Sequence, residues 1–122
     1  MDGASEYALG RRYLLGDGVV TDERVAATWY AKAAERGHIG AHRALGRMYS
    51  CGAGVERDYA AATSLLRTAA ERGDAGAQCA LAEILYRATP ESPEGVRWYE
   101  ASAASGNAEA ACALAHAQTS RM

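Results

Sequence analysis

The stretch LGRRYLLGDGVVTD at residues 9–22 returns as LGRMYSCGAGVERD at residues 45–58, with the first leucine, all three glycines, the tyrosine and the last aspartate preserved. The letters AAERG at residues 33–37 likewise return at residues 69–73. Both pairs lie 36 residues apart, and a fixed period of this length is typical of solenoids, in which each unit packs on its neighbours. The period therefore predicts a row of similar units, and it favours a binding surface over a catalytic centre.

Each unit is expected to consist of two helices joined by a glycine loop. In the first unit, apolar and small residues recur at helical spacing over residues 4–15 and again over residues 23–36. Gly16 suits a backbone that leaves a helix, Asp22 suits the N-cap of the second helix, and Gly37 is expected to end it. The second unit repeats this pattern and no segment alternates like a strand, so the chain is predicted to be all-α.

Small residues on the first helix of each unit are expected to let that helix lie close to its partner, while aromatic rings fill the remaining space. These small residues are Ala8, Gly10, Ala44, Gly46, Ala80 and Ala82. The rings include those of two Trp-Tyr pairs, Trp29-Tyr30 and Trp98-Tyr99. For both pairs, packing in the core is favoured over an exposed stacking platform.

The third unit departs from the pattern of the first two. Its glycine loop is replaced by RATPESP at residues 87–93, and the connection is about three residues shorter. Ser92 followed by Pro93 is nevertheless typical of a helix start. With a last helix at the C-terminus, seven helices are expected in all. We predict a single domain over residues 1–122, divided into units at about 4–39, 40–75 and 76–108 and a C-terminal helix at 109–119.

Composition excludes several classes of partner and location. The net charge is −2 and Lys and Arg form no one-sided block, which argues against nucleic acid or an anionic membrane as the main partner. No apolar run approaches the roughly 18 residues that a membrane-spanning helix needs. The start of the chain lacks the profile of a signal peptide, so a cytoplasmic protein is expected. Three cysteines at unequal spacing fit a reducing compartment better than a disulfide framework.

The pattern Ala-Leu-Gly-x-x-Tyr-x-x-Gly-x-Gly-Val-x-x-Asp, followed by a helix that ends in Ala-Ala-x-x-Gly, closely resembles the Sel-1-like repeat, a relative of the tetratricopeptide repeats. The resemblance covers residues 8–37 and 44–73 well, residues 80–106 in part, and residues 113–115 as a fragment. It implies a right-handed α-α superhelix of about three and a half helix-turn-helix repeats. It also implies a concave groove, lined by the first helix of each unit, that binds protein partners.

Equivalent positions on the first helices vary between units, whereas the leucines of the core hardly change. Variation on one face over a constant core is typical of a binding surface, and Arg and Tyr are enriched at interface hot spots. Three rows are expected to line the groove: Tyr7, Arg43, Cys79 and Cys112; Arg11, Arg47, Glu83 and His116; and Leu14, Ser50 and Tyr86.

The arginines in these rows suggest a ligand chemistry. Arg11, Arg43 and Arg47 are predicted to form a cationic half-groove for an acidic or carboxylate-terminated peptide segment. The alternative is that all three are ordinary solvated arginines on helix faces. The two interpretations differ in whether the charges converge on one hollow.

No pattern in the sequence supports catalysis or a cofactor. There is no Ser-His-Asp order, no phosphate-binding glycine loop and no zinc spacing, since Gly16-x-Gly18 belongs to the connection between helices. Cys79 and Cys112 are expected to lie too far apart for a disulfide. Cys112 with His116, or His38 with His42, would supply too few ligands for a metal. We therefore expect a protein that is not an enzyme and that carries no cofactor or metal.

The function predicted from the sequence is a bacterial protein–protein interaction module, or adaptor, that binds a partner protein or peptide through its concave groove. An immunity protein that neutralises a toxin is an alternative within the same class. A β-lactam-interacting or other hydrolase-like enzyme is the alternative of another class, disfavoured because no nucleophile and base can be named. Exposed ends of a solenoid also tend to associate, so a homodimer through the ends is a further hypothesis.

Overall fold

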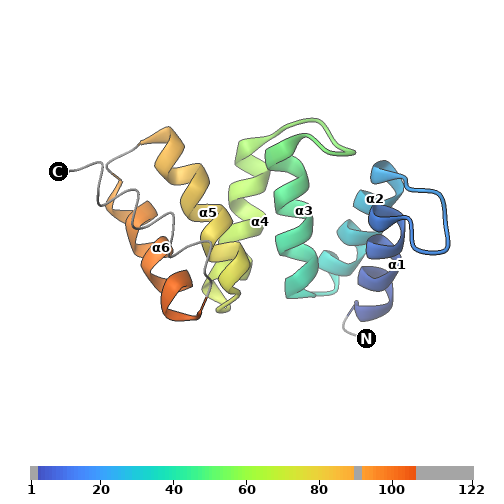
Figure 1. The fold of residues 1–122 in the computed structure, drawn as a ribbon, viewed down its shortest axis with the longest axis horizontal. Helices are drawn as coiled ribbons and strands as arrows, with labels where there is room; N and C mark the ends of the chain where they lie inside the picture. The colour runs from blue at the N-terminus through green and yellow to red at the C-terminus, as the bar shows by residue number, and fades with distance from the viewer. Residues whose placement is uncertain (1–2, 90–91, 107–122) are drawn as a thin grey trace.

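The computed structural model of the chain describes residues 3–89 and 92–106, and within them it contains helices and no strands. The predicted all-α class is confirmed, and the expected C-terminal helix at 109–119 lies outside the described residues. The helices stand in a row along the long axis of the molecule (Figure 1). They are α1 (Ala4–Leu15), α2 (Glu23–Glu35), α3 (Ile39–Cys51), α4 (Tyr59–Glu71), α5 (Ala75–Ala88) and α6 (Pro93–Ala104).

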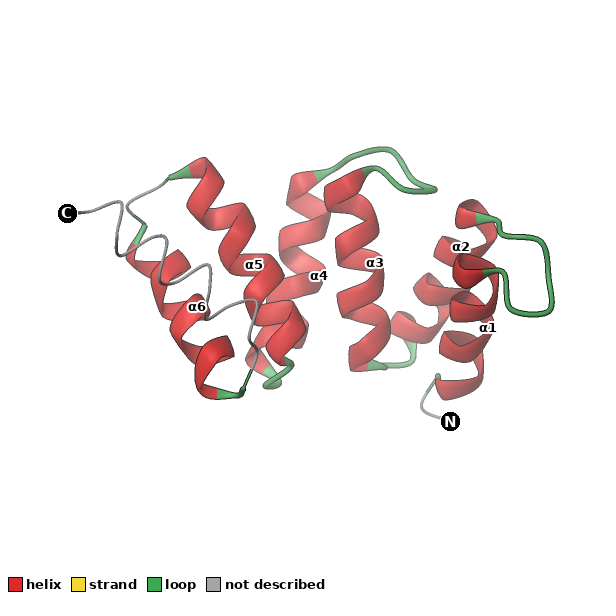
Figure 2. Ribbon diagram, viewed as in Figure 1, coloured by secondary structure: helices red, strands yellow, loops and turns green. Residues whose placement is uncertain are grey.

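Each unit is a pair of helices, and the pairs stack in chain order. The pairs α1–α2, α3–α4 and α5–α6 pack most extensively, and α2 with α3 and α4 with α5 join one pair to the next (Figure 2). Each helix thus contacts its neighbours along the row, as expected for an α-helical repeat superhelix. None of the helices in the described part of the chain is both long and apolar enough to cross a membrane.

The ends of the helices follow the local sequence. Asp22 is the N-cap of α2, and its carboxylate accepts hydrogen bonds from the amides of Arg24 and Val25 at 3.1 and 3.2 Å. Gly16 ends α1 in the left-handed conformation, with φ of 73°. Ser92 caps α6 through the amide of Gly95, directly before Pro93. These caps were all predicted from the sequence and are confirmed.

The core is built from small residues that face large ones. A Cβ added at Gly10 would lie 2.8 Å from Cδ1 of Tyr30, and one added at Gly46 would lie 2.7 Å from Cγ of Leu66. Tyr30 and Leu66 are almost completely buried. Burial also raises the pKa of Tyr99 to about 12, with the carboxylate of Glu83 adding to the rise. The two helices of a unit therefore approach closely at small residues, as predicted, and this close approach buries the large side chains.

Two expectations about packing are corrected. Ala8 was expected to pack against a partner but is exposed, because no helix of the described residues lies against that side of α1. Its counterpart Ala80 is only 6% exposed, since it lies between neighbouring units. The tryptophans of the two Trp-Tyr pairs are half-buried rather than fully buried, and Trp29 lies 4.6 Å from Nζ of Lys32. In both pairs the tyrosine, not the tryptophan, occupies the core.

The loop of the second unit, residues 52–58, rests on the first unit. Gly54 has φ of 72°, and a Cβ there would overlap the backbone of Glu23 at the start of α2. Val55 is half-buried and packs against the core that contains Tyr30. Figure 1 shows this loop reaching from α3 and α4 toward α2. The connection from α5 to α6 spans only residues 89–92, so the third unit has no comparable loop.

The contact at Gly46 yields a test of the close approach. Gly46→Ala should destabilise the protein by about 1–3 kcal/mol, although alanine favours helix, because the new methyl group would clash with the buried Leu66. Gly95→Ala is the matched control, since its Cβ would meet no atom closer than 3.4 Å. Urea unfolding would measure both variants. Equal stabilities for the two would contradict the proposed contact.

Buried Tyr99 should make the fold sensitive to alkaline pH. Its pKa is raised above the ordinary value of 10.0, so the stability contributed by the neutral phenol is present below pH 10 and is lost as pH rises toward 12. Tyr99→Phe should therefore reduce the fall in unfolding free energy between about pH 10 and pH 12, measured by urea titration. Tyr30, whose pKa burial also raises, is present in both proteins. An identical decline in both would refute the assignment.

Candidate binding site

The first helix of each unit contributes to one face, which we call the odd-helix face (α1, α3 and α5). A hollow of about 340 Å³ lies between α1 and α3, and it is referred to below as the smaller hollow. Its apolar floor includes Met48 and the ring of Tyr30 from α2. The structure brings together here five of the residues singled out in the sequence: Tyr7, Arg11, Leu14, Arg43 and Arg47.

A second hollow lies between α3 and α5 and measures about 730 Å³; it is referred to below as the larger hollow. Arg47 and Cys51 line both hollows, so they form the ridge between them. Of the residues expected from the sequence, Arg47, Ser50 and Glu83 lie here. The walls also contain Cys51, Tyr59, Ala80, Ile84, Arg87 and Ala88, which the sequence analysis did not select.

The two hollows also differ in the loops beside them. Ala53, from the loop of the second unit, lines the smaller hollow. Tyr59 begins α4 as Glu23 begins α2, and it is 47% exposed. Gly54 of the second unit's loop lies against Glu23, whereas Tyr59 lines the larger hollow. The helix start that the loop contacts in one unit is therefore part of the hollow in the next.

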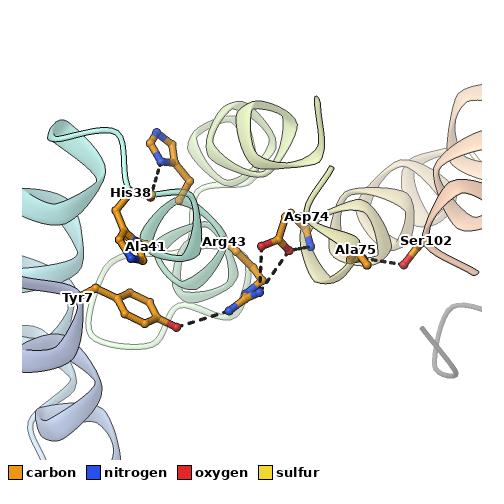
Figure 3. Close-up of polar contacts among 9 residues, drawn as sticks. Tyr7, His38, Ala41, Arg43, Asp74, Ala75 and Ser102 are labelled. Carbon is orange, nitrogen blue, oxygen red and sulfur yellow. Dashed lines mark hydrogen bonds and ion pairs between the residues drawn. The ribbon is translucent and has the colours of Figure 1, made fainter. Parts of the chain in front are cut away.

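Arg43 is held in a network that joins three units. Its guanidinium donates to both carboxylate oxygens of Asp74 at 3.0 and 3.3 Å, and it lies 3.5 Å from the hydroxyl of Tyr7 (Figure 3). Asp74 is also the N-cap of α5, where it accepts from the amide of Ala77. Arg43 is therefore neutralised by a carboxylate within the protein. It is not a free member of the predicted cationic half-groove.

His38 and His42 have structural roles at the start of α3. His38 is the N-cap, and its Nδ1 lies 3.1 Å from the amide nitrogen of Ala41, which donates to it. The His38 ring stacks on Tyr7 with 4.5 Å between centroids, and Nδ1 of His42 lies 2.9 Å from the carbonyl oxygen of His38. No cluster of three potential metal ligands occurs among residues 3–89 and 92–106. Both histidines thus serve the turn between the first two units.

Two residues expected on the face lie deeper than the sequence suggested. Cys79 is 1% exposed and packs with Ala82 and Tyr99. Tyr7 and Arg43 occupy the same position in the first two units, but their longer side chains reach the surface and the thiol does not. Cys79 is therefore part of the core. Tyr86 is half-buried, with its ring edge toward Tyr99 at 6.2 Å. The remaining expected residues, Cys112 and His116, lie outside the described residues.

Arg11 and Arg47 are the arginines left to interact with a ligand at the smaller hollow. Both side chains are exposed, and neither forms an ion pair with another described residue. Among the described residues, no Asp or Glu lines the smaller hollow. The described lining of the larger hollow includes Arg47, Arg87 and the acid Glu83. The odd-helix face therefore offers cations over apolar floors.

One row of this face was missed in the sequence although the period marks it. Leu15, Cys51 and Arg87 are successive members of a row with a spacing of 36 residues, and each lines a hollow. Extending each row by one position would have found them. Tyr59 carries no such signal, because its counterpart one period earlier, Glu23, lines neither hollow.

Comparison with known proteins agrees with the geometry. The family model described as Sel1 repeat matches residues 3–38, 39–74 and 75–107. A search of curated proteins found no match. Among solved structures, a protective antigen of uropathogenic Escherichia coli with an SLR fold is 35% identical with a TM-score of 0.84, over 88% of this chain and 24% of its own. A Sel1 repeat protein from Oxalobacter formigenes is 30% identical with a TM-score of 0.84, over 92% of this chain and 47% of its own.

These matches cover most of the chain, which spans about a quarter and about half of the two solved proteins. Repeats of this kind are generally protein-interaction modules and typically have no enzymatic activity. The period of 36 residues, the paired helices and the three matched units agree with one another. The chain belongs to the Sel1 repeat family.

Proposed function

We propose that the chain binds a partner protein through the odd-helix face, and that an acidic segment of the partner enters the smaller hollow. The observation that carries the proposal is the pair of cations, Arg11 and Arg47, which form no ion pair with a described residue and lie beside an apolar floor. A carboxylate placed between them would form charge-assisted hydrogen bonds. An adjacent apolar side chain would pack on Leu14 and Met48.

The smaller hollow is preorganised: its walls are already ordered, so the protein does not need to rearrange when a peptide segment binds. Tyr7 is stacked on His38 and lies beside the guanidinium of Arg43, so two walls are fixed before a ligand arrives. Arg43 is in turn held by Asp74 of the next unit. Side chains that are already ordered lose little conformational entropy when a ligand binds. The network thereby lets Arg43 shape the hollow while Arg11 and Arg47 supply the charge.

We also propose that the protein acts as a bacterial adaptor in the cytoplasm and has no catalytic role. Cys51 is exposed with a free thiol, which suits a reducing compartment. The two solved relatives described above are of bacterial origin. The histidines nearest to the odd-helix face, His38 and His42, make contacts that cap and brace α3, which supports a role in binding rather than catalysis.

Selection from a library of random peptides would test the proposed ligand chemistry. Peptides retained by the protein should be enriched in Asp or Glu next to apolar residues. The double variant Arg11→Glu/Arg47→Glu should raise the Kd of a selected peptide by about ten- to a hundredfold, as expected for loss of charge-assisted hydrogen bonds. Isothermal titration would measure the Kd, and circular dichroism would verify that the variant folds.

The matched control reverses two exposed arginines outside both hollows, Arg24 and Arg72. Arg24→Glu/Arg72→Glu changes the net charge equally but should leave the Kd within about twofold. Peptides without acidic residues, or equal loss of affinity in both double variants, would show that the smaller hollow does not select an acidic segment.

A further inference from the structure

The larger hollow is the place where one structural element of the repeat is absent. Between the first two units, the loop at residues 52–58 rests on the start of α2, with Gly54 against Glu23 and Val55 against the core. Between the second and third units, only residues 89–92 connect α5 to α6, and Tyr59 at the start of α4 is 47% exposed. The hollow there is about 730 Å³, against about 340 Å³ one unit earlier.

The first unit has a loop of the same type, and no helix start among the described residues lies against it. Residues 16–22 repeat the Gly-x-Gly-Val-x-x-Asp pattern of residues 52–58 and lie at the end of the row of helices (Figure 1). A Cβ at Gly18 would meet only the guanidinium of Arg12, whereas one at Gly54 would overlap backbone. The loop of the first unit is thus shaped to rest on a helix start, and no described residue provides one.

Large apolar side chains are exposed at both places. Among the described residues, those that are clearly exposed are Leu15 at 66%, Val20 at 88% and Tyr59 at 47%. Val20 lies in the loop at residues 16–22, Leu15 precedes that loop and lines the smaller hollow, and Tyr59 is on the wall of the larger hollow. Charges match as well, since Asp17 lies in the loop and Arg87 lines the hollow.

We propose that the loop at residues 16–22 of one copy of the chain seats in the larger hollow of a second copy, so that the protein self-associates. The contact would place a loop of the same type at the equivalent helix start, with Val19 in the position that Val55 has in the second unit. Val20, at the position of Glu56, would pack against Tyr59, and Asp17 would pair with Arg87. Each copy has one loop and one hollow, so two copies that exchange loops would form a symmetric dimer. Self-association is measured without a peptide, so its failure is distinguishable from failure of the proposed function.

Light scattering after size-exclusion chromatography of the full chain would test the proposal. The mass should rise above 12.8 kDa as the concentration increases. Val20→Asp should weaken self-association at least tenfold, because it places a charge against the apolar wall. Thr28→Asp is the control, an exposed position on α2, and should associate like the wild type. A monomer at every concentration, or equal association of both variants, would overturn the proposal.

A charge exchange tests the orientation of the loop. Asp17→Arg and Arg87→Asp should each weaken self-association, because each leaves two like charges facing one another. The double variant Asp17→Arg/Arg87→Asp should restore it to within about threefold of the wild type. Additive weakening in the double variant would show that the two side chains do not meet.

Cys51 provides a site-specific readout, because it is exposed and lines the larger hollow. Under mild oxidation, Val20→Cys should form an intermolecular disulfide, and peptide mapping should identify Cys51 as its partner. The variant Val20→Cys/Cys51→Ser should form no such disulfide. A cross-link that persists without Cys51 would mean that the loops meet elsewhere, and the absence of any cross-link in Val20→Cys would equally reject the contact.

Discussion

The close approach of the two helices within each unit is the constraint on which the rest of the structure depends. At Gly10 and Gly46 the backbone of the first helix lies directly against a buried side chain of the second. Any Cβ at these positions would push the helices apart by contact with Tyr30 or Leu66. Since large side chains fill the space that glycine leaves, each pair is a dense body. Stacking such bodies produces a regular face of first helices.

The loops then make the units differ at their surface. In the second unit, the loop rests on the preceding helix start, and its Ala53 lines the hollow beside α1. In the third unit, the connection is three residues shorter, Tyr59 is exposed, and the hollow between α3 and α5 is about twice as large. The paired helices are similar in all three units, so the units differ in their surface more than in their core. The proposed self-association depends on this difference between units.

The polar contacts along the odd-helix face distinguish two kinds of arginine: one that joins neighbouring units and others that are available to a ligand. Arg43 and Asp74 belong to successive units and hold them in register, whereas Arg11 and Arg47 have no described partner. The same position of the repeat carries Tyr7, Arg43 and buried Cys79, with three different roles. Variation at a repeat position is thus not by itself a sign of ligand contact. Burial and pairing must be known before such a residue is assigned to a site.

The sequence by itself determined the period, the helices, the caps such as Asp22, and the small-against-large packing, because these depend on contacts within a unit and recur 36 residues apart. It also indicated most of the residues around the smaller hollow. Only the tertiary structure decided that Arg43 is neutralised by Asp74, that Cys79 is buried and that Tyr59 is open. Those outcomes depend on contacts between one unit and the next. The sequence pattern within a unit does not specify these contacts.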